Sequence, residues 1–70
     1  MPDGVEAMVA WANLVKAIVA TMRDEDVGND TIMAFLDHVD DANLEVLGGA
    51  TLQFAMHVTD VCRAMVPSND

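Results

Sequence analysis

Basic side chains are scarce in this sequence. Lys16, Arg23 and Arg63 are its only lysine and arginine residues, against 12 aspartates and glutamates, and the formal net charge is -9. Proteins that bind DNA or RNA need a basic patch that neutralises phosphates, and anionic membrane surfaces attract basic segments in the same way. We therefore expect no direct binding to nucleic acid and none to membranes. The charge instead favours solubility, a basic protein partner or imitation of a polyanion.

Cysteine is almost absent as well. Cys62 is the single cysteine, so no disulfide can form within the chain, and a free thiol suits a reducing compartment. The first residues lack the positively charged segment of a secretory signal. The apolar run over 7–22 is short and is interrupted by Asn13 and Lys16, which argues against a transmembrane span. These features predict a cytoplasmic protein.

Strand-like alternation of apolar and polar residues is also missing, whereas apolar residues recur at helical spacing throughout. We therefore expect an all-α fold in a single domain over 1–70. The pattern predicts helices over about 4–23, 30–39 and 42–66, an acidic loop over 24–29 and a frayed tail over 67–70. Asp3 can cap the first helix, and Asp40 and Asp41 are expected to end the second.

A heptad-like stripe runs along the C-terminal part of the chain. Its spacing of three and four residues predicts a helix-packing surface. The stripe keeps its phase across Gly48 and Gly49, although each glycine costs about 1 kcal/mol inside a helix. We therefore expect one long helix with a weak point at the glycines, two long helices in total, and a short second helix between them. The members of the stripe are Leu44, Leu47, Thr51, Phe54, Val58, Val61 and Met65.

The chain is rich in apolar residues for its length. They make up 53% of only 70 residues, and a monomer of this size buries only about 60% of its unfolded surface. Self-association would resolve this conflict by covering a second face of each helix. We therefore expect a helical-bundle homodimer. The residues expected to form its internal and dimer contacts are Trp11, Val15, Ile18, Phe54, Val58 and Val61.

The acidic residues are expected to present an outward surface, formed by Asp24, Glu25, Asp26, Asp37, Asp40 and Asp41. The favoured function is a non-enzymatic protein–protein interaction module, a small acidic homo-oligomer that binds or inhibits a host or cellular protein. In size and composition the chain resembles small acidic accessory proteins of phages that infect GC-rich bacteria, and this resemblance assigns no residue a role. A first alternative is a DNA mimic that inhibits a nucleic-acid-binding protein. A second is a small metal-binding protein or enzyme.

Motifs that would support the second alternative are weak. Read as a calcium loop from its first aspartate, the segment 24–35 places Asn29 where glycine is needed and Phe35 where a bidentate glutamate is needed. The acids and histidine within 37–41 match no strong metal motif. His57 and Asp60 can touch on one helix face, but no activated nucleophile accompanies them. We therefore expect no catalytic residue, no cofactor and no metal.

Overall fold

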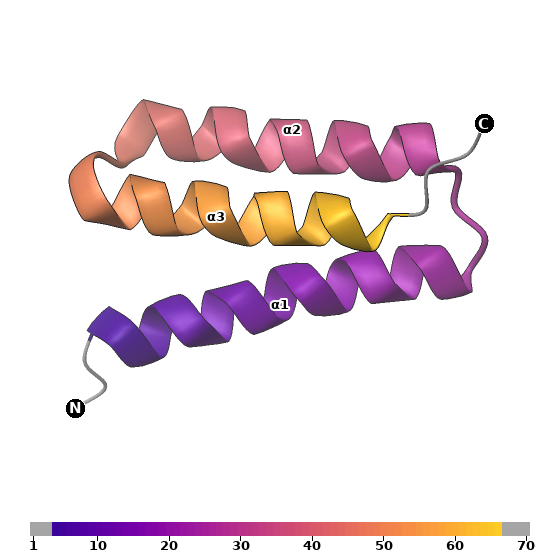
Figure 1. Ribbon diagram of the computed structural model, residues 1–70, viewed down its shortest axis with the longest axis horizontal. Helices are drawn as coiled ribbons and strands as arrows, with labels where there is room; N and C mark the ends of the chain where they lie inside the picture. Colours follow the sequence, from indigo (N-terminus) through magenta and orange to yellow (C-terminus); the bar gives the residue numbers. More distant parts are fainter. Residues whose placement is uncertain (1–3, 67–70) are drawn as a thin grey trace.

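The computed structural model describes residues 4–66 and shows three α-helices joined by short connections (Figure 1). They are α1 (Gly4–Asp24), α2 (Asn29–Val46) and α3 (Gly49–Met65), and no strand occurs among the described residues. This confirms the predicted all-α fold with three helices. The expectations for Asp3 and for 67–70 fall outside the described part of the chain.

A tight link joins α1 to α2. The N–H of Val27 donates to the carbonyl of Met22 over 2.9 Å, which closes the end of α1. Asp26 has a φ of 60°, a left-handed conformation that aspartate adopts more readily than most residues. The carbonyl of Gly28 then accepts from the N–H groups of Thr31 and Ile32, which starts α2. The link therefore reverses the chain and sets α2 antiparallel to α1.

The predicted long helix over 42–66 is wrong. Leu47 and Gly48 are extended, and α3 begins at Gly49 with a φ of +60°. Glycine reaches this left-handed region without the steric cost that other residues meet, so the glycine pair makes a turn. The turn folds α3 back on α2, which lets both helices bury an apolar stripe. Of the members of the stripe only Val58 is buried, whereas Leu44 and Val61 are exposed, so the shared phase across the glycines does not mark one core-facing row.

The second helix is also longer than expected. It has 18 residues, against 21 in α1 and 17 in α3, so the prediction of a short second helix is wrong. Asp40 and Asp41 do not end it but lie within its last two turns. The most extensive helix–helix contact joins α2 and α3, and α3 lies between the other two helices in Figure 1.

The core is built mostly from small and β-branched side chains of all three helices. It lies toward the link between α1 and α2, because the first two turns of α1 and the residues of α2 after Asp40 contain no buried position. In Figure 1 the axis of α1 diverges from α3 toward its N-terminus. One end of the molecule is therefore closed by a core and the other is open. The core cluster consists of Ala12, Val15, Val19, Ile32, Leu36, Val58 and Cys62.

The open end gives the molecule more surface than its mass requires. Its accessible surface is 4767 Å², whereas a compact monomer of 7.5 kDa has about 4,200 Å². Its radius of gyration is 12.7 Å, against about 11 Å for a compact chain of this length. The surface includes large apolar side chains at Val5, Val9, Leu14, Leu44, Val46 and Val61.

α1 is the one described helix that is long and apolar enough to cross a membrane, judged by length and composition alone. A helix of 21 residues is about 31 Å long, close to the thickness of the hydrocarbon layer. Lys16 lies in its middle, where a charged residue is costly in lipid. The expectations of a cytoplasmic location and of no membrane binding stay predictions.

Candidate functional site

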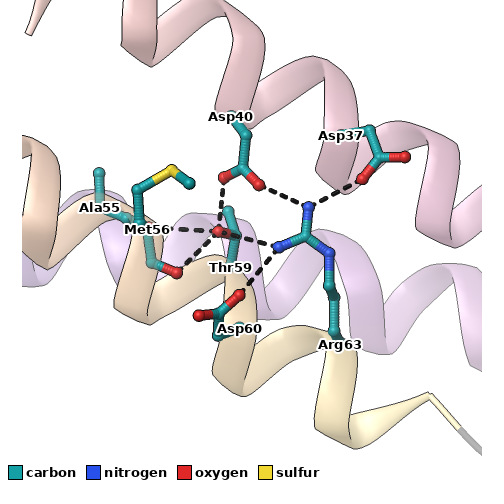
Figure 2. Close-up of polar contacts among 7 residues, drawn as sticks. All are labelled: Asp37, Asp40, Ala55, Met56, Thr59, Asp60 and Arg63. Carbon is teal, nitrogen blue, oxygen red and sulfur yellow. Dashed lines mark hydrogen bonds and ion pairs between the residues drawn. The ribbon is translucent and has the colours of Figure 1, made fainter.

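Arg63 holds α2 and α3 together at the centre of a polar cluster (Figure 2). Its guanidinium donates to Asp40 over 2.5 Å and to Asp37 over 2.9 Å, and both acceptors belong to α2. It also donates to Asp60 of its own helix over 3.1 Å. Thr59 completes the cluster, since its hydroxyl donates to Asp40 over 2.6 Å. These contacts fix the register of α3 against α2.

The environments of the three carboxylates differ. The side chain of Asp40 is 11% exposed, whereas those of Asp37 and Asp60 are 69% and 71% exposed. A buried carboxylate is tolerated when charged and hydroxyl donors satisfy it, as Arg63 and Thr59 do for Asp40. The hydrogen bond that Arg63 donates to Asp40 is the main reason that the pKa of Arg63 is raised above its ordinary value. The cluster is therefore a structural clamp between two helices.

A first apolar groove lies between the N-terminal half of α1 and the turn that joins α2 to α3. It encloses about 210 Å³. Trp11 and Phe54, both half-buried, form much of its wall, and the Nδ2 atom of Asn43 is buried beside it with no hydrogen-bond partner among the described residues. We call it the Trp11 groove. Its lining residues are Ala7, Met8, Trp11, Asn43, Leu47, Thr51, Phe54 and Ala55.

A second groove lies between α1 and α3 and shares Phe54 with the first. It encloses about 270 Å³. Val9 and Val61 are 49% and 42% exposed on its two sides, and Lys16 and His57 supply polar groups. We call it the Val9 groove. Its lining residues are Val9, Ala12, Asn13, Lys16, Phe54, His57, Val58 and Val61.

The structure separates the six residues expected at internal and dimer contacts. Val15 and Val58 belong to the core of the chain itself, with 3% and 7% exposure. Phe54, Val58 and Val61 meet along the Val9 groove, whereas Trp11 lines the other groove. Ile18 lines a separate shallow hollow with Ala17, Thr21 and Met22. The predicted set thus combines core positions, two surface grooves and a separate hollow.

The predicted acidic surface needs a correction at Asp40, which is buried inside the clamp. The sequence predicts that Asp40 ends the second helix and faces outward, but Arg63 approaches from α3 and pairs with its carboxylate. Asp37 is exposed and also contacts Arg63. The remaining members, Asp24, Glu25, Asp26 and Asp41, are exposed. Two of the six predicted acids, Asp37 and Asp40, therefore contact Arg63.

Sequence reasoning missed three features of these sites. Val9 is not among the residues expected at internal or dimer contacts, yet it lies beside a groove. Asn43 belongs to no sequence motif. Only the turn at Gly48 and Gly49 brings the residues around it together. Arg63 was counted only as one of three cations. A signal existed for this last case: Arg63 lies three residues after Asp60 and four after Thr59, a spacing that permits contact on a helix.

Two of the candidate chemical groups have structural surroundings. Cys62 is fully buried in the core, and burial raises the pKa of its thiol above the ordinary value, while Lys16 and Arg63 oppose the shift to a lesser extent. Asp60, which was expected beside His57, accepts a hydrogen bond from Arg63. Within residues 4–66 no group of three or more His, Cys, Asp or Glu side chains is placed to hold a metal ion. The expectations of no enzyme activity and no cofactor stay predictions.

Similarity to characterised proteins gives no guide to the function of this chain. No protein-family model matches it, and comparisons with curated proteins and with solved structures find no significant match. The two grooves and the clamp are therefore the features from which a function can be inferred.

Proposed function

We propose that this protein is a non-enzymatic interaction module that forms a homodimer through the Val9 groove and presents acidic residues to a basic protein partner. The observation that carries the proposal is the apolar surface left along α1 and α3. Val9 and Val61 are about half exposed on opposite sides of a groove whose floor includes Ala12 and Val58.

The exposed surface is large enough for such an interface. A stable interface buries about 800 Å² on each partner, roughly a sixth of the 4767 Å² that this chain exposes. A two-fold dimer uses the same patch on both copies, so one groove per chain is sufficient. A second copy that covers Val9, Val61 and the edge of Phe54 would remove their apolar surface from water. This removal stabilises the dimer by about 25 cal/mol per Å² of apolar surface.

The exposed acids support a basic partner for the assembled protein. Asp24, Glu25 and Asp26 follow one another at the end of α1 and in the link. No described residue forms a salt bridge with any of these three. Such a run raises the encounter rate with a positively charged protein and makes binding weaken as salt increases.

Two matched substitutions test the dimer. V61K places a charge beside the Val9 groove, whereas V46K makes the same change at a position that is 79% exposed near the end of α2. We expect the wild type and V46K to be dimers and V61K to be a monomer in light scattering coupled to size exclusion. Circular dichroism on each variant checks that the helices remain.

Two outcomes would contradict the proposal. A folded V61K protein that stays dimeric places the interface elsewhere, and a wild type that is monomeric at all accessible concentrations removes the dimer altogether. The partner is tested separately by its salt dependence: binding of a basic protein that does not weaken between low and high salt would contradict an electrostatic role for the acidic run.

A further inference from the structure

Lys16 is an isolated cation beside an apolar groove. It lines the Val9 groove and is exposed, and within residues 4–66 no carboxylate forms a salt bridge or hydrogen bond with its ammonium group. The nearest acids on α1 are Glu6 and Asp24, about 15 and 12 Å away along the helix axis. The ammonium group of Lys16 is therefore open to an anion from outside the chain.

The helices that form the groove are locally positive, although the whole chain has a net charge of -9. Over 7–22 of α1 and 49–65 of α3 the lysines, arginines and acids are Lys16, Asp60 and Arg63, so two cations and one anion give a net charge of +1. The anion, Asp60, already pairs with Arg63 over 3.1 Å. Acids more than about 8 Å away are largely screened at physiological salt, so a small anion can approach the groove.

The lining of the groove places this charge at one end of an apolar surface. α1 and α3 run in the same direction in Figure 1, and each lines the groove with residues at positions i, i+3, i+4 and i+7, beginning at Val9 and at Phe54. Val9 and Lys16 are therefore about 10 Å apart along the axis of α1. Lys16 lies at the same end as Val61, and Val9 lies at the same end as Phe54.

We propose that the Val9 groove binds an unbranched alkyl carboxylate of medium length, with its carboxylate on Nζ of Lys16 and its chain extending toward Val9 and Phe54. A single ammonium group is a point charge, which matches a monoanion better than a phosphate dianion. A fully extended chain advances about 1.2 Å per bond, so octanoate extends over about 8 Å. The groove encloses about 270 Å³, more than the cavity of about 150 Å³ that holds benzene in another protein.

The same ligand would regulate the dimer. In the proposed homodimer a second copy covers Val9, Val61 and the edge of Phe54, which are the residues that the alkyl chain would cover. The ligand and the second copy therefore exclude each other. This regulation rests on the proposed function, whereas binding of the carboxylate does not.

Nuclear magnetic resonance of the backbone amides of Val9 and Val61 tests binding. We expect octanoate to shift both signals with a Kd of about 1 mM. Octanamide, which has the same number of non-hydrogen atoms and no charge, should bind about threefold more weakly. Butanoate should bind at least tenfold more weakly than octanoate, because four methylenes are missing. Each ligand meets the same competing copy, so the order of affinities does not depend on the dimer.

A matched pair of variants isolates the charge. K16Q and R23Q each remove one cation from α1, so both change the net charge of the chain equally, but only Lys16 lines the groove. The preference for octanoate over octanamide should disappear in K16Q and remain in R23Q. Equal binding of the two ligands to the wild type, or a preference that K16Q retains, would overturn the inference. Larger shifts at the indole N–H of Trp11 than at Val9 and Val61 would also overturn it, because they place the chain in the other groove.

Light scattering coupled to size exclusion tests the regulation. Octanoate should convert the wild-type dimer into monomers, whereas butanoate at the same concentration and ionic strength should not. A dimer that persists while octanoate shifts Val9 and Val61 would overturn the competition. If the wild type is monomeric without ligand, the homodimer fails, and the comparison of K16Q with R23Q still decides the binding. Co-sedimentation with phosphatidylglycerol vesicles would overturn a soluble ligand, because it identifies a bilayer as the source of the alkyl chain.

Discussion

Replacing Arg63 by methionine should destabilise this fold more than any other change to its surface charges. The substitution keeps the aliphatic stem of the side chain and removes the guanidinium that contacts Asp37, Asp40 and Asp60. Asp40 would then remain buried, with Thr59 as its only donor in the described part of the chain. The fold would have to retain a nearly desolvated carboxylate or protonate it, and both options cost free energy.

The magnitude follows from the exposure of each partner. Removing one member of a fully buried ion pair costs about 3–5 kcal/mol. The pair here is partly screened, with side chains 22% and 11% exposed, so we expect about 2–3 kcal/mol. Asp37 and Asp60 add less than about 1 kcal/mol, because exposed pairs contribute little. A chain of 70 residues has about 4–10 kcal/mol of stability in total, so R63M removes a large share.

Urea unfolding followed by circular dichroism measures this loss at a fixed protein concentration. With a slope of about 1 kcal/mol per M, the midpoint of R63M should fall by about 2–3 M. R23M is the control, since Arg23 is exposed in the last turn of α1 and should change stability by less than about 0.5 kcal/mol.

The double variant D40L/R63M separates a clamp from a general packing effect. With both charges gone no buried carboxylate remains at the clamp, and Thr59 still has the carbonyls of Met56 and Ala55 within 3.0 and 3.4 Å. We expect this variant to lie within about 1 kcal/mol of the wild type. Arg63 is not a clamp if R63M costs no more stability than R23M, or if the double variant is less stable than R63M alone.

Three further predictions concern the turn, the thiol and the core. G49A should lose about 1–2 kcal/mol of stability, because the φ of Gly49 is +60°. G28A should change stability little, because the φ of Gly28 is -60° and open space lies where its Cβ would be. Equal shifts of the two melting temperatures would contradict this. Because burial raises the pKa of Cys62, its folded form holds the proton more tightly than the unfolded form. The contribution of Cys62 to stability should therefore be intact below pH 9 and fall as pH rises further, by at most about 1.4 kcal/mol per pH unit. The urea midpoint of C62A should not show this fall. Identical pH profiles for C62A and the wild type would contradict a role of the buried thiol. L36A, which truncates a fully buried side chain, should cost about 2–5 kcal/mol in the same assay.

The sequence was sufficient for the helical class and for much of the core. Ile32 and Leu36, four residues apart on α2, are both buried, because a core-facing row repeats every three to four residues whatever the tertiary arrangement. The end of α2 could not be found in this way. The apolar period is the same on both sides of Gly48, and only the backbone conformation at Gly49 reveals the turn.

The sites depended on contacts between helices that a local pattern does not encode. In the sequence Asp40 looks like a solvated or capping acid. Only the fold brings it into contact with Arg63, which lies 23 residues further along the chain. Val15 and Val9 are both apolar residues of α1, yet one is buried in the core and the other is exposed beside a groove. Which apolar position faces a neighbouring helix depends on how α1 is rotated and tilted against α3, and neither quantity follows from spacing alone.

Sedimentation equilibrium of the wild-type protein decides whether a second copy covers the apolar surface along α1 and α3. For a chain of 7.5 kDa, we predict twice that mass at concentrations down to about 1 μM, where an interface of standard size remains occupied. A particle of single-chain mass throughout the range from about 1 to 100 μM, folded by circular dichroism, would contradict the account.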